Sequence, residues 1–559
     1  MIKTKIVSSL EKALLTQNID EYKDLKKLSA LRGERISFQL LHTYIFEEIS
    51  PNANPNRANA TISAKGELAK YASFRDVSNV AVTRPTLETS GDDDGFISKE
   101  PGLFPDLLLP IVKNKLVCVT ARLLLSVWID ITVPSDIKAG EYATTVTLEC
   151  DGQKSESTVV IEIINATLPE ESIYFTQWFH TDCLANYYNV DVWSERHWEI
   201  IENFARVAVK NGINLLLTPV FTPPLDTEQG GERKTTQLVG VTLSNKEYSF
   251  DFTLLDRWIE MCDRVGIKYF EISHLFTQWG AKHAPKIMAS VDGEYKKIFG
   301  WETDSCGEEY TFFLRTFLRE FISHMKKKGR DKDCFFHISD EPARDHIEFY
   351  KAAKATVADL LKDYTIMDAL SKYDFWTEGV VSTPIPASNH IAPFIEGKVP
   401  NLWTYYCCSQ IQKVSNRFIS MPSARNRSIG FQMYKYDIVG FLHWGYNFYN
   451  NYLSRGEINP FVQQDGNAWI TPGDAYSVYP AQNGEALESI RIIVFAEALA
   501  DLRAMRLCEK YYGKDTIVNI IEEEMGVSVT FETCTTSPDV ILNIRERVNQ
   551  LIKKAVEKY

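Results

Sequence analysis

The segment CFFHISDEP, residues 334–342, joins an apolar run to two adjacent carboxylates and a proline. Residues 334–339 have the length and apolar character of a buried strand. Pro342 cannot donate a backbone hydrogen bond to a sheet, so the strand ends where Asp340 and Glu341 appear. The segment therefore predicts a buried strand that delivers two acids at its carboxyl end.

Seven similar runs accompany this segment between residues 174 and 444, and helical stretches with apolar residues three and four apart (198–208, 254–265 and 310–327) separate several of them. The predicted strands are 174–180, 213–220, 269–274, 334–339, 364–369, 375–381, 402–407 and 440–444. Strands alternating with helices over about 270 residues predict a (β/α)8 catalytic barrel of the TIM type, spanning 171–484. An open nucleotide-binding sheet has no support, because no glycine-rich phosphate loop follows any strand.

The flanking regions follow other patterns. Residues 1–170 predict an antiparallel β-sandwich, with strands at 36–45, 116–120 and 123–133 and a hairpin that turns at Asp151-Gly152. A Gly91–Gly95 loop and several prolines separate its strands. Residues 485–559 contain helical stretches at 485–511 and 538–557, which we expect to pack on the barrel. The predicted fold is therefore a multidomain chain with a β-sandwich, an α/β barrel and C-terminal helices.

Composition excludes several classes of function. The 559 residues carry a net charge of −13 without a basic arm or stripe, so nucleic acid is not an expected partner. No apolar run reaches the roughly 18 residues of a membrane span. Polar residues at 8, 9, 11 and 12 interrupt any signal-peptide core, and the ten scattered cysteines suit free thiols, so we expect a cytoplasmic location. No cofactor is expected, and the oligomeric state stays open.

Aromatic, acidic and histidine side chains recur at the predicted strand ends. Apolar sugar faces stack on Trp and Tyr, while sugar hydroxyls bind carboxylates, histidine and asparagine, so this mixture favours a carbohydrate ligand. Besides the two acids, the candidate substrate-binding residues are Trp178, His180, Asp182, Glu271, His274, His337, Trp403, Tyr405, Trp444 and Tyr446.

The adjacency of Asp340 and Glu341 restricts the chemistry that they can perform. Neighbouring residues on an extended chain cannot easily flank a glycosidic bond as an acid and a nucleophile about 5.5 Å apart. If the substrate carries a 2-acetamido group, its carbonyl oxygen can attack the anomeric carbon instead. Glu341 then protonates the leaving oxygen and later activates water, while Asp340 orients the acetamide and stabilises the cationic oxazolinium.

Two other functions stay open at this point. One is a two-carboxylate retaining glycosidase in which Glu341 is the acid and Glu271 the nucleophile. The other is a non-catalytic glycan-binding protein, which the β-sandwich and the aromatic residues would also suit. Histidines at four strand ends (180, 274, 337 and 443) raise the question of a metal, but no H-x-H pair occurs, so we expect binding or packing histidines and no metal.

The chain resembles glycoside hydrolase family 123 over nearly its whole length. The resemblance rests on the sandwich turn AGEY (139–142), on SDEP (339–342) at the fourth barrel strand and on LHWGY (442–446) at the eighth. It implies an exo-acting, retaining N-acetyl-β-galactosaminidase that works through an oxazoline-type intermediate. The implied substrate is terminal β-linked N-acetylgalactosamine on glycosphingolipid-type oligosaccharides, with Asp340 as the acetamide stabiliser and Glu341 as the acid/base.

Overall fold

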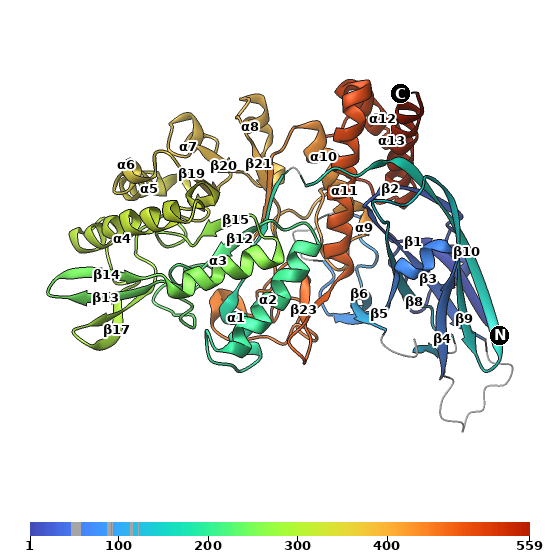
Figure 1. The fold of residues 1–559 in the computed structure, drawn as a ribbon, viewed down its shortest axis with the longest axis horizontal. Helices are drawn as coiled ribbons and strands as arrows, with labels where there is room; N and C mark the ends of the chain where they lie inside the picture. Colours follow the sequence, from blue (N-terminus) through green and yellow to red (C-terminus); the bar gives the residue numbers. More distant parts are fainter. Residues whose placement is uncertain are drawn as a thin grey trace.

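The computed structural model describes residues 1–45, 57–86, 91, 93–111, 116–120, 122–171 and 173–558. Part of the predicted 91–95 loop, Asp92, lies outside the described residues. A β-rich N-terminal region and an α/β region lie side by side, and the C-terminal helices stand where the two meet (Figure 1).

The N-terminal region contains two five-stranded sheets among the described residues, with the strand orders β1-β3-β8-β5-β6 and β2-β10-β9-β4-β7. Buried residues of both sheets, such as Phe38 and Ile161, belong to one hydrophobic core. The predicted hairpin is confirmed: β9 and β10 pair antiparallel across Asp151 and Gly152, whose φ angles of 51° and 76° suit a tight hairpin turn. The strands are β1 (Ile2–Ser8), β2 (Lys27–Arg32), β3 (Arg35–Tyr44), β4 (Arg57–Lys65), β5 (Ala72–Val82), β6 (Gly102–Pro110), β7 (Leu116–Thr120), β8 (Leu125–Thr132), β9 (Gly140–Cys150) and β10 (Gln153–Thr167).

The α/β region holds eight parallel strands within residues 173–558, in a three-stranded sheet of order β11-β22-β21 and a five-stranded sheet of order β12-β15-β18-β19-β20. The described residues thus form two sheets and not the continuous ladder of a closed barrel. Single backbone hydrogen bonds join their edges, from Asn214 to Phe175 (3.1 Å) and from Tyr405 to Pro386 (3.2 Å). The strands are β11 (Tyr174–Gln177), β12 (Leu215–Thr218), β15 (Tyr269–Ile272), β18 (Cys334–Phe336), β19 (Thr365–Ala369), β20 (Thr383–Ile385), β21 (Trp403–Tyr405) and β22 (Gly440–His443).

One predicted strand is wrong. Residues 375–381 begin within helix α7 (Asp374–Thr377), where Phe375 is buried against Tyr350, and the strand of this repeat is β20. Pro384 argues against a strand in the sequence, yet β20 tolerates it because β20 is the edge strand of its sheet.

Helices follow the strands, and the predicted α2, α3 and α4 bury their apolar faces. The helices between β11 and β22 are α1 (Thr181–Tyr187), α2 (Glu195–Lys210), α3 (Thr253–Val265), α4 (Glu308–Lys327), α5 (Ile347–Ala355), α6 (Ala358–Leu361), α7, α8 (Ala392–Glu396), α9 (Ser423–Arg427) and α10 (Ile429–Lys435). The loops after β12 and β15 also build a small sheet of order β14-β13-β16-β17, which the sequence did not predict. Its strands are β13 (Gly240–Ser244), β14 (Glu247–Asp251), β16 (Ile287–Val291) and β17 (Glu294–Phe299).

The C-terminal helices are α11 (Ile490–Tyr512), α12 (Lys514–Met525) and α13 (Pro538–Lys558). Helix α11 starts later than predicted because residues 486–488 form β24 (Ala486–Glu488), which pairs with β23 (Val478–Pro480), and Ser489 then caps the helix. Helix α11 contacts α9 and α10, whereas α13 contacts β2 and β10 of the N-terminal region. None of the helices in the described part of the chain combines the length and apolar character that a bilayer crossing requires.

Candidate active site

Asp340 and Glu341, the carboxylate pair, lie four and five residues beyond the end of β18, after the buried segment 337–339. The Glu341 N–H donates to the carbonyl of Ala369 at the end of β19 (3.0 Å), and the Asp340 carbonyl accepts the N–H of Trp279 from the loop after β15 (2.9 Å). Glu341 has a φ of 41°, in the left-handed region that costs energy for a residue with a side chain. Bonds to two neighbouring strand ends therefore hold the pair in a fixed, strained turn.

The two carboxylates have different surroundings. Glu341 is exposed, and its Oε1 accepts a hydrogen bond of 2.5 Å from the hydroxyl of Tyr405, at the end of β21. Burial and the Glu341 charge raise the pKa of Tyr405 well above its usual range, so the phenol keeps its proton and acts as a donor. Asp340 is half-buried, and no side-chain donor of the described residues contacts its carboxylate. Burial, Glu341 and Asp226 raise the pKa of Asp340 well above its usual range.

Asp226 is a third carboxylate at this site, and sequence reasoning missed it. Its N–H donates to Gln278 Oε1 (2.6 Å), its carbonyl accepts from Ser454 Oγ (2.7 Å), and its φ is 44°. Burial raises the pKa of Asp226 to about 7. The charge of Arg233 lowers this pKa, whereas the charge of Glu341 raises it further. Asp226 lies eight residues beyond β12 in a Pro-Pro loop, so no local periodicity in the sequence marks it.

A buried ion network lies beneath the pair. His337 is fully buried between Glu271 (2.8 Å to Oε1) and Asp368 (3.2 Å to Oδ1). Burial alone would lower the pKa of His337, but its hydrogen bonds to Asp368 and Glu271 raise it to about 9, so the ring is an imidazolium. Glu271 also accepts from Thr176 Oγ1 (2.5 Å) and Trp178 Nε1 (2.7 Å). Three donors thus occupy the Glu271 carboxylate.

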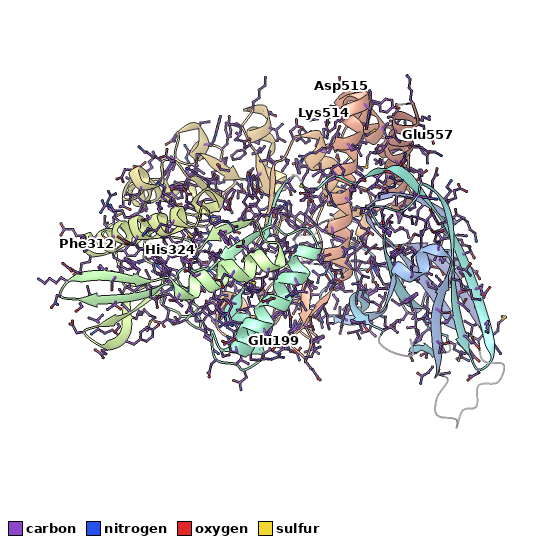
Figure 2. The ribbon with its side chains drawn as sticks, in the orientation of Figure 1. Glu199, Phe312, His324, Lys514, Asp515 and Glu557 are labelled. Atoms are coloured by element: carbon purple, nitrogen blue, oxygen red, sulfur yellow. The ribbon has the colours of Figure 1, made fainter. Side chains whose placement is uncertain are left out.

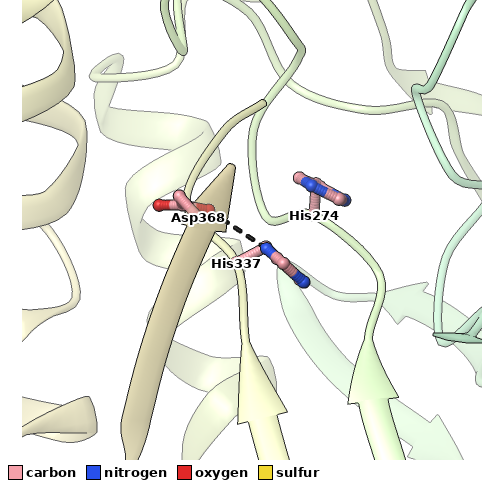
Figure 3. Close-up of side chains that lie close together, drawn as sticks. All are labelled: His274, His337 and Asp368. Atoms are coloured by element: carbon pink, nitrogen blue, oxygen red, sulfur yellow. Dashed lines mark hydrogen bonds and ion pairs between the residues drawn. The ribbon is translucent and has the colours of Figure 1, made fainter. Parts of the chain in front are cut away.

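His274, His337 and Asp368 lie close enough together to be considered as metal ligands (Figure 3). The His274 ring stacks on His337 at 4.2 Å, and burial together with the His337 charge lowers the pKa of His274 well below its usual range. Both His337 nitrogens are already hydrogen-bonded, and Asp368 also accepts from Tyr350 and the backbone. A metal would have to displace these bonds, so the geometry favours a charged histidine stacked on a neutral one.

His180 and Asp182 belong to another buried cluster. Arg233, from the loop after β12, donates to both Asp182 oxygens (2.6 and 2.7 Å) and to His180 Nδ1 (3.0 Å). Burial and Arg233 lower the pKa of His180 to about 3, so this ring is neutral. Through Arg233 the two residues anchor the loop that carries Asp226, and their substrate contact stays a prediction.

The predicted aromatic residues differ in how deeply they are buried. Trp403 is buried and stacks on Tyr174 at 5.5 Å, and the buried Tyr446 donates to the carbonyl of Phe204 (2.8 Å). Both pack in the interior of the α/β region, and their sugar-binding role stays a prediction. Trp178 is also buried and lies edge-on to His274 (5.4 Å).

Trp444 is the half-buried member of the predicted set. Its indole N–H donates to Asp474 Oδ2 (2.8 Å), and its ring lies 6.0 Å from that of Trp469. Tyr405 lies beside the carboxylate pair through its bond to Glu341, whereas the Trp444 side chain contacts Asp474 and neighbouring aromatic rings.

A separate cavity of about 520 Å³ lies between the N-terminal region and α13. Ion pairs line it, including Arg427 with Glu497 and Arg545 with Glu34. Its polar groups satisfy one another, and it lies away from the carboxylate pair.

Comparison with known proteins identifies the family. The sequence model described as "Glycoside hydrolase 123, catalytic domain" matches residues 178–508, and the chain belongs to glycoside hydrolase family 123. A family 123 glycoside hydrolase from Clostridium perfringens has a similar fold, with a TM-score of 0.73, 16% identity and coverage of 100% of this chain and 99% of that one. A β-glucuronidase from Parabacteroides merdae aligns at a TM-score of 0.31 and 9% identity, over 90% of this chain and 51% of that one. No curated protein sequence matches the chain. Membership of the family makes the chain a glycosidase that acts on a carbohydrate.

Proposed function

We propose that this glycosidase is an exo-acting N-acetyl-β-galactosaminidase that retains configuration by substrate-assisted catalysis. The observation that carries the proposal is the carboxylate pair on one strand end, with one acid exposed and the other half-buried. Because two adjacent acids cannot easily act as acid and nucleophile on opposite sides of the bond, the 2-acetamido oxygen of the substrate can act as the nucleophile. Asp340 is the acetamide stabiliser and Glu341 the general acid and base.

The electrostatics support this division of roles. Burial and the charges of Glu341 and Asp226 raise the pKa of Asp340, so the free enzyme favours the protonated form of this acid. On substrate binding the acetamide N–H favours the ionised form of Asp340, whose proton passes to solvent, and Glu341 donates its own proton to the leaving oxygen. In the second step, water attacks the anomeric carbon, its proton passes to Glu341, and the acetamide is released unchanged.

The alternative that uses Glu271 as a nucleophile is less well supported. Glu271 is fully buried, and donors from Thr176, Trp178 and His337 occupy its oxygens. It would have to lose these bonds before it could attack a sugar, and such buried charged groups are costly to leave unpaired. A purely glycan-binding role disagrees with membership of a hydrolase family.

The proposal also covers the arrangement of the two parallel sheets and the identity of the glycan substrate. We propose that the two parallel sheets together form a (β/α)8 barrel at 171–484, between a β-sandwich at 1–170 and a helical segment at 485–559. The backbone bonds at both sheet junctions support it. The Clostridium perfringens relative is described in terms of glycolipid glycan hydrolysis, which supports terminal β-linked N-acetylgalactosamine on glycolipid-type glycans as the substrate.

The test compares aryl β-hexosaminides that differ only at C2 and C4 of the sugar. We expect the 2-acetamido galactoside to be the best substrate and a thiazoline that mimics the cyclised acetamide to inhibit its hydrolysis. Replacing the acetamide by a hydroxyl removes the internal nucleophile, so the rate should fall by at least about 10³-fold. Equal rates on the two C2 variants would refute the acetamide mechanism, and a preference for the gluco isomer would refute the substrate.

A further inference from the structure

Trp279 stands out because it is an exposed indole in a strained turn. It follows β15, and 41% of its surface is exposed. Trp279, Gly280 and Ala281 have consecutive φ angles of 59°, 122° and 56°. A left-handed conformation costs roughly 1–2 kcal/mol for a residue with a side chain, and an exposed indole gains little from burial in return. The turn therefore presents part of an indole to solvent at a cost in backbone energy.

The turn is fastened to the loop that carries the carboxylate pair. The Trp279 N–H donates to the Asp340 carbonyl (2.9 Å), and Ser339 Oγ donates to the carbonyl of Thr277 (2.9 Å). Gly280 lies so close to His346 that a Cβ would approach its ring to 2.8 Å. The position of the Trp279 backbone is thus fixed relative to Asp340.

The surface beside Trp279 continues with other exposed groups. Phe349 is 51% exposed, and Lys282 Nζ lies 4.7 Å from its ring centre. No ring or cation of the described residues stacks on the Trp279 indole itself, which leaves a face of it free for a ligand.

The carboxylates of the site differ in their exposure to solvent. Asp226 and Asp340 are half-buried, whereas Glu341 and Trp279 are exposed, and the Trp279 backbone bonds to that of Asp340. In an exo-acting enzyme the terminal sugar occupies the inner groups, and the leaving group extends past the general acid towards solvent.

We propose that Trp279 is the platform on which the first sugar of the leaving group stacks while Glu341 protonates the glycosidic oxygen. This inference rests on the proposed function. The ligand is a neutral pyranose that presents its apolar C–H face to the indole, so Trp279 distinguishes glycan leaving groups from small ones.

The test is a change in substrate preference. The two substrates are 2-acetamido-2-deoxy-β-galactosyl fluoride, whose leaving group has no sugar, and a trisaccharide in which N-acetylgalactosamine is β-linked to lactose. For Trp279→Ala we expect the ratio of kcat/KM on the trisaccharide to kcat/KM on the fluoride to fall at least tenfold. Trp279→Phe, which keeps a ring, should fall less. The control is Phe312→Ala, another exposed aromatic (57%), which contacts Tyr248 at the outer end of α4 (Figure 2) and should leave the ratio unchanged.

An unchanged ratio, or an equal loss on both substrates, would overturn the platform. A second measurement does not depend on turnover: saturation-transfer NMR with free lactose should show binding to the wild type that Trp279→Ala removes. If the wild type hydrolyses neither substrate but binds lactose through Trp279, the proposed function fails and with it the leaving-group role, and Trp279 is a sugar-stacking residue only. If lactose binding does not depend on Trp279, the platform fails, whatever the turnover.

Discussion

Tyr405→Phe removes one oxygen atom and leaves the ring that fills the space between the strands. The hydroxyl donates to Glu341 at 2.5 Å, and Glu341 otherwise stands exposed in a left-handed turn, so Tyr405 is the group that positions its carboxylate. A hydrogen bond to a charged group contributes about 1.5–3 kcal/mol. If that bond orients Glu341 in the transition state, kcat/KM should fall about 10- to 150-fold. The assay is hydrolysis of an aryl N-acetyl-β-galactosaminide with a poor leaving group.

Tyr406→Phe is the matched control, because the same atom is removed one residue further along the chain. The Tyr406 hydroxyl donates to Asn426 Oδ1 (3.0 Å) in the buried core, away from the carboxylate pair. Its loss should lower the free energy of unfolding by about 1 kcal/mol and change kcat/KM less than twofold. The reasoning is refuted if Tyr405→Phe stays within twofold of the wild type, or if both variants lose activity equally.

Three further variants test the remaining carboxylates. Glu341→Gln should abolish turnover of poor leaving groups, while activated aryl groups recover part of it; a loss of equal size across leaving groups would contradict the acid role. Glu271→Gln should lower the free energy of unfolding in denaturant by about 3–5 kcal/mol, because it leaves the buried His337 charge short of a partner; a sugar trapped covalently on Glu271 would contradict this. The pKa of Asp226 is raised to about 7, so the folded state binds its proton more tightly, and this contribution to stability is lost as pH rises from about 4 to 7. Asp226→Asn should therefore gain stability relative to the wild type over that interval, and a difference that does not vary with pH would show the assignment to be wrong.

The sequence predicted the elements whose pattern is local. The hairpin at Asp151-Gly152 is present as predicted, whereas the apolar run before Asp340 forms a strand only over Cys334–Phe336, the first half of the predicted 334–339. The strand placed at 375–381 failed because its aromatic residues serve a helix, and because Pro384 is acceptable only on an edge strand. Edge position is a property of the whole sheet, and no short stretch of sequence encodes it.

The position of an aromatic residue along its strand decides whether its side chain lies near Glu341. Trp403 is the first residue of β21 and Tyr405 the third, so only Tyr405 reaches the carboxyl end where Glu341 lies. Strand membership alone did not distinguish the two positions. Asp226 was missed for the opposite reason, since it lies in a loop and is brought to the site by bonds to Gln278 and Ser454, which are distant in the sequence.

The charges around the pair suit the proposed reaction. The inner network contains one imidazolium, His337, and two carboxylates, so it is net negative. Asp340 experiences the His337 charge, which lowers its pKa, and the charges of Glu341 and Asp226, which raise it after burial has done so. A site of this kind resists a further negative charge in the ground state but stabilises a positive charge when one develops on the sugar and the acetamide. Burial and the charges of Glu341 and Asp226 make Asp340 hard to ionise in the free enzyme. The positive charge of the oxazolinium opposes this effect, so it favours the ionised form of Asp340 when the reaction requires it.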